Sequence, residues 1–322
     1  MSIYKSGFSD CVERFVNYRK ASGSWNEPNH GLNIKLFDHF CAKNYPGKEL
    51  CQEMVDTWCA QRKTELNRSC YTRTQVIRNF IDYLRKRELT KAVSVTPPKP
   101  EKSKYVPYAF SREELLKFFY ACDSIVPYKQ MRQSWLRKIV CPVFFRLLYS
   151  SGIRTTEARY LRREDVDLTH GVLNIRKSKG YDQHYVALHT SMTKLLRKYD
   201  RTVNKLQPNR TYFFQKADGT HYTRDWIKFN FAALWIKANG KENRPVAYDL
   251  RHNYAITNIN SWDCDAFGFS DKLTFLSKSM GHRWIGATLY YYSFVPNLAN
   301  IIREKTEAGF NAIVPEVAYE DE

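Results

Sequence analysis

Five separated positions in the second half of the chain carry side chains that could together break and rejoin a phosphodiester bond. They are Arg154, Lys179, Arg251, His282 and Tyr291. Two arginines can hold the non-bridging oxygens of a phosphate bidentately, because a guanidinium never loses its charge at neutral pH. A lysine can protonate the leaving oxygen, and a deprotonated tyrosine can attack phosphorus. The covalent phosphotyrosine would keep the energy of the broken bond, so rejoining would need no nucleotide.

Neighbouring residues leave alternatives at two of these positions. Lys177 competes with Lys179 as the lysine of a predicted turn, and Tyr290 and Tyr292 flank Tyr291. Consecutive helical residues point about 100° apart, so the three tyrosines cannot share one pocket. Tyr291 lies nine positions after His282. A loop and a short helix must therefore turn the chain back to bring this tyrosine towards the arginines.

Two further polar residues are expected to support the site. Glu157 lies three residues after Arg154, on the same face of a predicted helix, and should orient an arginine or pack against it. His252 follows Arg251 directly and should support the helix or the backbone. We expect neither residue to be a principal catalytic group.

Motifs for nucleotides and metals are missing from the sequence. It contains no GxxxxGK[ST], no GxGxxG and no HExxH pattern. We therefore predict no cofactor and no bound metal. Scattered aspartates and glutamates keep a carboxylate-bound metal mechanism as an alternative.

The elements that must position these side chains are mostly helices, because apolar residues recur at three- and four-residue spacing. One helix should begin at a capping box formed by Ser111 and Glu114. Further helices are expected over 135–150, 155–163, 192–199, 224–239, 250–259, 272–280 and 287–292. Alternating apolar residues predict one β-hairpin from 172–176 and 184–189, with Lys179 in its turn. His282 would follow a helix-ending glycine, Gly281.

The first 92 residues predict a separate helical domain, with helices over 8–20, 32–43, 51–63 and 73–87. Pro97, Pro98 and Pro100 then favour an extended linker. We place this linker at 93–106, a mixed domain at 107–306 and an acidic tail at 307–322. The fold class is mainly α, with an N-terminal helical domain and an α+β domain that contains a small antiparallel sheet.

The charge of the chain indicates a polyanionic partner. Its 51 lysines and arginines against 33 aspartates and glutamates give a net charge of +18, which favours binding to nucleic acid through counterion release. The longest apolar stretch, 139–145, is far below the roughly 18 residues that a membrane span needs. The eight cysteines form no CxxC pair. These features predict a cytoplasmic protein with reduced thiols and no membrane partner.

The pieces SGIRTTEA, DLRH and MGH, followed by a tyrosine, resemble the tyrosine recombinases, or phage-type integrases, in order and spacing. The resemblance runs from about residue 110 to 295. It implies catalytic roles for Arg154, Lys179, Tyr248, Arg251, His282 and Tyr291, listed here in chain order. The family's usual lysine-glycine turn favours Lys179. Tyr248 stands where the family most often has histidine, and a neutral phenol offers no imidazolium charge.

The same resemblance implies a function. A site-specific recombinase or integrase would cleave double-stranded DNA at a specific recombination site and leave a 3′-phosphotyrosine. Four copies of the chain would exchange strands through a Holliday junction. Residues 1–92 would be the family's helical core-binding domain. An integrase of a mobile element is favoured over a chromosome-dimer resolvase.

Two other functions stay open at this point. A type IB topoisomerase-like enzyme would use the same cleavage chemistry on one strand without exchange. A non-catalytic DNA-binding protein on the same scaffold would lack an essential group, and Tyr248 is the only departure that points this way.

Overall fold

In the computed structural model, the structure describes residues 3–101, 105–128, 131–176, 183–242, 244–262 and 266–292, without the side chains of 266, 267 and 292. The chain divides into two compact units, residues 1–105 and 106–322. Each unit has its own hydrophobic core. Two of the predictions above, the Lys179 turn and the acidic tail at 307–322, lie outside the described residues.

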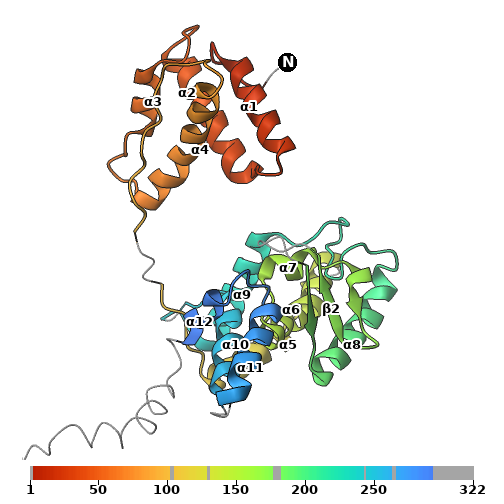
Figure 1. Cartoon of the computed structure of the whole chain (residues 1–322). Coiled ribbons are helices and arrows are strands. Elements are labelled where there is room, and N and C mark those ends of the chain that lie inside the picture. Colours follow the sequence, from red (N-terminus) through yellow and green to blue (C-terminus); the bar gives the residue numbers. More distant parts are fainter. Residues whose placement is uncertain are drawn as a thin grey trace, which may run out of the picture. The chain divides into compact units, whose positions relative to one another are not determined.

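The N-terminal unit is a bundle of helices (Figure 1). Its elements are α1 (Ser9–Ala21), η1 (Glu27–Gly31), α2 (Leu32–Asn44), α3 (Gln52–Cys59) and α4 (Asn67–Arg85). Aromatic rings from three of these helices meet in the core, because Phe15, Phe37 and Phe80 are each at most 1% exposed. The helical character predicted for this part of the sequence is confirmed.

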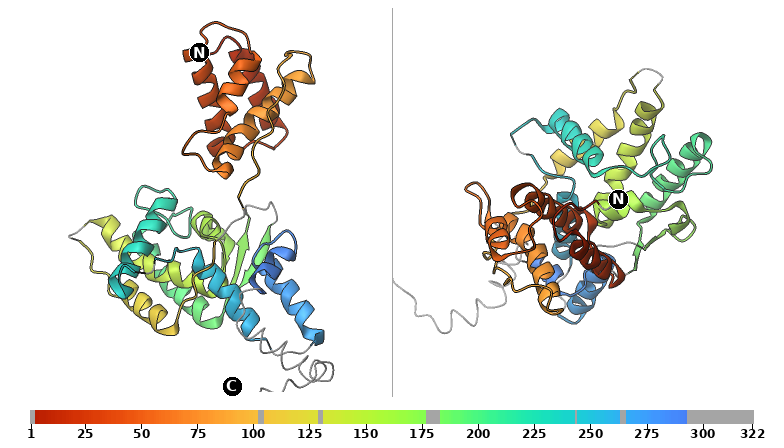
Figure 2. Two further views of the ribbon diagram at one scale, coloured as in Figure 1. Left: turned by 90° about the vertical axis from the view of Figure 1, so that its left-hand side faces the viewer. Right: turned by 90° about the horizontal axis from the view of Figure 1, so that it is seen from above.

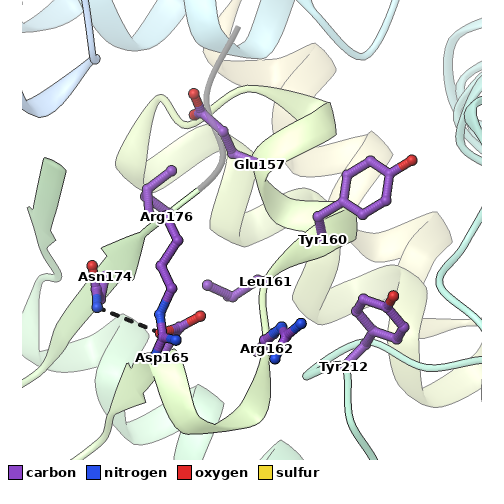
Figure 3. Close-up of a pocket in the computed structure, with 9 residues that line it drawn as sticks. Glu157, Tyr160, Leu161, Arg162, Asp165, Asn174, Arg176 and Tyr212 are labelled. Atoms are coloured by element: carbon purple, nitrogen blue, oxygen red, sulfur yellow. Dashed lines mark hydrogen bonds and ion pairs between the residues drawn. The ribbon is translucent and has the colours of Figure 1, made fainter. Parts of the chain in front are cut away.

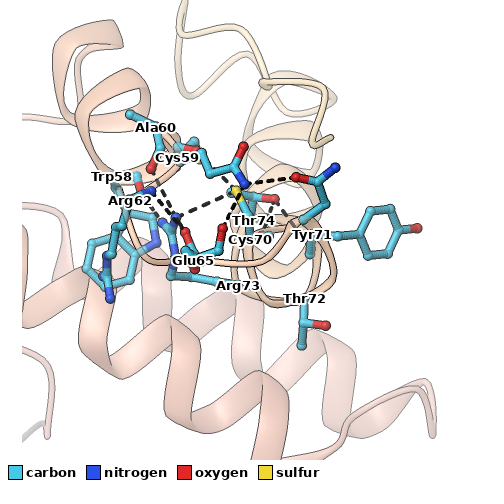
Figure 4. A network of polar contacts seen from close by, with 12 residues as sticks. Trp58, Cys59, Ala60, Arg62, Glu65, Cys70, Tyr71, Thr72, Arg73 and Thr74 are labelled. Carbon is cyan, nitrogen blue, oxygen red and sulfur yellow. Dashed lines mark hydrogen bonds and ion pairs between the residues drawn. The ribbon is translucent and has the colours of Figure 1, made fainter. Parts of the chain in front are cut away.

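A buried arginine explains why α3 is shorter and α4 longer than the apolar spacing predicts. The Arg73 guanidinium donates to the Glu65 carboxylate at 2.6 Å and to the carbonyl of Ala60 at 3.1 Å, and also reaches the carbonyl of Trp58 (Figure 4). Its hydrogen bonds, and then its charge, hold the pKa of Glu65 down to about 2. These contacts use carbonyls at the end of α3 and fix the loop before α4, so the charged side chain belongs to the interior.

The proline-rich segment packs against the N-terminal unit over much of its described length. The Val93 amide donates to the Gln52 side chain at 2.7 Å. The Glu101 carboxylate accepts the amides of Asn67 and Arg68, at 2.6 and 3.0 Å, and so caps the first turn of α4. The segment has no helix or strand in its described residues, but it is anchored at both of these points.

The C-terminal unit is also mainly helical and surrounds a core rich in phenylalanine. Phe118, Phe144, Phe145 and Phe214 are fully buried there. Its helices are α5 (Arg112–Asp123), α6 (Arg132–Ser151), α7 (Thr155–Tyr160), α8 (Thr190–Leu206), α9 (Arg224–Asn239), α10 (Asp249–Asn260), α11 (Ala266–Ser279) and α12 (Gly286–Tyr292), with a 3-10 turn, η2 (Arg163–Asp165). The predicted capping box is confirmed, since Ser111 and Glu114 exchange hydrogen bonds at the start of α5.

Three short strands form an antiparallel sheet in the order β1-β2-β3. They are β1 (Val166–Asp167), β2 (Val172–Ile175) and β3 (His184–Ala187). The predicted hairpin is confirmed, with Val172 opposite Ala187 and Ile175 opposite His184. Strand β3 packs against α11, and Figure 2 shows α11 and α12 (blue) beside the sheet.

The seven cysteines within the described residues are free thiols, and five of them are buried. Burial raises the pKa of Cys41, Cys59 and Cys141 to about 12, so these thiols stay protonated. No described helix is both long and apolar enough to span a membrane.

Candidate active site

Arg251 lies at the centre of the residues that the sequence singles out. Its side chain comes from the first turn of α10 and is 1% exposed. The guanidinium donates to the carbonyl of Gly152 at 2.6 Å, to the carbonyl of Met280 at 2.7 Å, and to Nε2 of His282 at 2.9 Å. One planar side chain therefore joins the ends of α6 and α11 to α10.

Arg154 occupies the neighbouring position, directly before α7. Its Nη2 donates to the carbonyl of Gly281 at 2.8 Å, and its Nη1 pairs with Glu157 at 2.6 Å. The other carboxylate oxygen of Glu157 accepts the backbone amide of Arg154 at 2.7 Å. The Glu157 side chain is only 1% exposed. It therefore holds both the guanidinium and the backbone of Arg154 from the interior, which agrees with the orienting role expected for it.

Helix ends supply the carbonyls that hold both arginines. Gly152 follows α6 with φ of 63°, and Gly281 follows α11 with φ of 62°, the left-handed conformation that ends helices. The last carbonyls of a helix carry a partial negative charge and favour cations. Neither glycine has room for a Cβ atom, which would lie 2.2 Å from the Tyr254 ring at Gly152 and 2.5 Å from the His184 ring at Gly281.

His282 is held between an arginine and a threonine. Its Nδ1 lies 2.7 Å from Oγ1 of Thr288, and its Nε2 lies 2.9 Å from Nη2 of Arg251. An arginine can only donate, so Nε2 must accept and Nδ1 must carry the proton. Burial, followed by the charges of Arg251 and Arg154, lowers the pKa of His282 to about 3. The imidazole is therefore neutral at physiological pH.

Because the pKa of His282 is low, the free energy of unfolding should depend on pH in acid. The unfolded chain takes up the His282 proton near pH 6.5 and the folded chain only near pH 3, so between these values the unfolded state binds more protons. The free energy of unfolding should therefore rise with pH across that window and lose this dependence above it. Urea titrations at pH 4.5, 5.5 and 7 give the free energy of unfolding at each pH. This free energy should rise less with pH in His282→Gln than in the unsubstituted chain. If the free energy of unfolding of His282→Gln depended on pH as strongly as that of the unsubstituted chain, the neutral assignment of His282 would be contradicted.

Tyr291 lies on α12 with its ring packed inside the same cluster. It is 3% exposed, with ring centroids 5.4 Å from His252 and 6.1 Å from His282. Burial raises the pKa of its phenol, while the charge of Arg251 lowers it. Tyr290 points elsewhere, since it is 44% exposed, whereas the side chain of Tyr292 lies outside the described residues.

Tyr248 lies at the edge of the cluster, at the start of α10. It is 39% exposed, and its ring packs edge-on against His252 with centroids 5.0 Å apart. His252 thus stands between Tyr248 and Tyr291, and burial lowers the pKa of this imidazole. The structure brings Arg154, Arg251, His282 and Tyr291 together with Tyr248 beside them, and Lys179 lies outside the described residues.

Two partners of the cluster are missing from the sequence-based interpretation. Thr288 is fully buried and fixes the His282 tautomer, and its place three residues before Tyr291 is the only signal that could have suggested it. His184 lies against Gly281, and its charge contributes to the low pKa of His282. It comes from β3, so the strand next to the Lys179 turn touches the site.

A cavity of about 190 Å³ has Glu157 in its lining (Figure 3). Its lining includes Asp165, Asn174 and Arg176. The Asp165 carboxylate accepts from Arg176 at 2.5 Å and from Asn174 at 3.4 Å, so the polar groups there satisfy one another. No group of metal-ligating side chains occurs among the described residues.

Comparison with known proteins gives one family. The sequence model described as "Phage integrase family" matches residues 111–294. The putative integrase/recombinase y4rE of Sinorhizobium fredii is 28% identical over 249 residues, which cover 73% of this chain and 75% of that protein. The tyrosine recombinase XerC of Bacillus pumilus is 23% identical over 295 residues, 89% of this chain and 84% of its own.

Solved structures share the fold. A lambda integrase (75–356) dimer bound to a COC′ core site matches with a TM-score of 0.59 at 16% identity, over 88% of this chain and 94% of that one. The XerH site-specific recombinase bound to difH in a pre-cleavage complex matches with a TM-score of 0.60 at 15% identity, over 92% and 84% of the two chains.

Proposed function

Since this chain belongs to the phage integrase family of tyrosine-type site-specific DNA recombinases, we propose that it cleaves and rejoins duplex DNA through a covalent bond between Tyr291 and a 3′ phosphate. The observation that carries the proposal is the convergence of two arginines, a neutral histidine and a buried tyrosine on one point of the C-terminal unit. Each group has a separate task in the reaction.

The arginines bind the scissile phosphate. Attack on phosphorus moves negative charge onto the two non-bridging oxygens, and fixed donors aimed at those oxygens lower the barrier. Arg154 is the more accessible of the two, with its side chain 16% exposed. Arg251 is held by carbonyls and by His282, so its charge is already oriented before DNA arrives.

Tyr291 supplies the nucleophile. Its Oη forms the new bond to phosphorus as the bond from phosphorus to the 5′ oxygen breaks. The phenolic proton must leave first, because burial keeps the phenol protonated. The neutral imidazole of His252, whose ring centroid lies 5.4 Å from that of Tyr291, is the group we assign to receive it, because both nitrogens of His282 are already engaged and the phenol of Tyr248 is a poor acceptor.

Lys179 supplies the proton that the 5′ oxygen takes up. It is assigned from the sequence, where it follows β2 and precedes β3, and β3 touches the site through His184. Rejoining reverses the same steps: a 5′ hydroxyl attacks the phosphotyrosine, its proton returns to the lysine, and the tyrosine is released. No nucleotide is consumed.

The partner is double-stranded DNA at a specific recombination site, with four chains exchanging strands through a Holliday junction. A lambda integrase tetramer bound to a Holliday junction has the same fold, with a TM-score of 0.59 at 14% identity. Residues 1–92 serve as the core-binding domain, residues 107–306 as the catalytic domain, and residues 93–106 as the linker. The net charge of +18 favours phosphate binding by both domains.

The proposal is tested by trapping the covalent intermediate. A nicked duplex carrying the site recovered from DNA bound to the protein should yield a protein–DNA adduct that resists denaturation. The adduct should form in excess EDTA and without ATP, because the four clustered side chains supply the charge and the nucleophile. An adduct that required magnesium would replace the proposed mechanism with a carboxylate–metal one. Relaxation of supercoiled DNA by a monomer, without strand exchange, would indicate the topoisomerase-like alternative.

A further inference from the structure

Helix α8 presents four exposed basic residues on its outer face. Its inner residues Met192, Leu196 and Val203 are buried in the core of the C-terminal unit. The exposed residues along the other side include Lys194, Lys198, Arg201 and Lys205, which we call the α8 basic face. Their spacing of four, three and four residues places all four on one side of the helix.

Within the part of the chain that the structure describes, the charges of the α8 basic face have no ion-pair partner. Elsewhere in the chain, Lys117 pairs with Glu113 at 2.7 Å and Lys216 pairs with Asp218 at 2.8 Å. No described residue pairs with any member of the α8 basic face. The single acidic residue of α8, Asp200, bonds instead to Arg210 on the inner side.

This arrangement destabilises the isolated helix. Like charges three or four residues apart on a helix repel one another, and the α8 basic face contains three such pairs in succession. A bound polyanion would remove that repulsion.

The C-terminal end of the α8 basic face is remote from the catalytic cluster. The carbonyl of Leu206, the last residue of α8, accepts from Arg132 at the first residue of α6. Arg251 binds Gly152 at the opposite end of α6, and a 20-residue helix is about 30 Å long. In Figure 1, β2 lies between α8 on one side and α11 and α12 on the other.

We infer that the α8 basic face binds the phosphate backbone of a second duplex DNA segment, separate from the one held at the catalytic cluster. Lys194 and Lys205 are eleven residues apart, or about 16 Å along the helix. One strand of a duplex presents about five phosphates over that length. Lysine and arginine bind phosphates as charges without reading bases, so this contact is sequence-independent. The inference rests on the proposed function, in which strand exchange brings two duplexes to the enzyme.

Lysine protection tests the inference in the full chain. The probe is a 30-base-pair duplex of arbitrary sequence, added to the protein before brief acetylation and mass spectrometry. Lys194, Lys198 and Lys205 should become protected at two duplexes per chain and remain reactive at one. Equal reactivity with and without excess duplex would overturn the inference. Protection by polyglutamate but not by duplex would also overturn it, and would assign the face to an acidic polypeptide.

Variants measure the size of the effect. The triple variant K194Q/K198Q/K205Q should lower the salt slope of second-duplex binding by about 2.7, since each neutralised phosphate contributes about 0.9. The control K20Q/K117Q/K216Q removes the same charge from lysines that face carboxylates and should leave the slope unchanged. Equal slopes in the two variants would contradict the inference. Loss of the first duplex, or of the covalent adduct, in the unsubstituted chain would instead contradict the proposed function.

Discussion

We expect the Tyr291→Phe variant to form no covalent adduct with DNA while it still binds the duplex. The substitution removes one oxygen and keeps the ring, which packs against His252 and His282 within a small core that includes Met280. The core should therefore remain filled, and the variant should unfold close to the unsubstituted chain. Adduct formation is measured with the nicked duplex on denaturing gels, and binding by a titration at fixed salt.

Tyr290→Phe is the matched control, because it removes the same atom one residue away. Tyr290 is 44% exposed, whereas Tyr291 is 3% exposed beside the arginines. The control should keep forming adduct. Peptide mapping of the trapped phosphotyrosine to position 290 or 292 would contradict the assignment, and so would adduct formation by Tyr291→Phe.

Arg154, Arg251, His282 and Tyr291, which the structure brings together, could be singled out from the sequence because their residue types are restricted. Only a permanent cation suits the positions of Arg154 and Arg251, and Gly281 precedes His282 in the left-handed conformation expected of a helix-ending residue. What holds these residues could not be predicted. Arg251 binds carbonyls of Gly152 and Met280, which are 99 and 29 positions away, and a backbone carbonyl has no sequence signature.

The predicted helix boundaries were wrong where a charged residue is buried inside a helix or where a distant residue caps the helix. Arg73 reads as a surface residue at a helix start, but it is 6% exposed and lies one and a half turns inside α4. The polar first turn of α4 is capped by Glu101, a residue more than thirty positions away. Similarly, α8 continues to Leu206 because Val203 extends its buried face, beyond the end predicted at residue 199. Strand β1 has two residues, too few for any alternation to show.

The Arg251→Lys variant should lose cleavage by at least about 10²-fold, the usual cost of removing one donor from a developing negative charge. Lysine keeps the positive charge but replaces the planar fork with a single point of donation. It cannot reach Gly152, Met280 and His282 together, so some of these contacts are lost in a site that is 1% exposed. The free energy of unfolding should fall by about 2 kcal/mol or more, because hydrogen bonds to charged groups contribute about 1.5–3 kcal/mol each.

A second buried arginine separates lost chemistry from lost stability. Arg73 in the N-terminal unit is 6% exposed and binds the carbonyl of Ala60 and the carboxylate of Glu65. Arg73→Lys should therefore destabilise the chain to a similar degree without touching the catalytic cluster. Adduct formation is compared per folded molecule, with saturating duplex, below the melting temperature of both variants. Cleavage should survive in Arg73→Lys and be lost in Arg251→Lys, because of these two residues only Arg251 has a proposed role in binding the scissile phosphate. Equal losses would mean that Arg251 merely joins α6, α10 and α11, and the phosphate would then have to be bound by Arg154 alone.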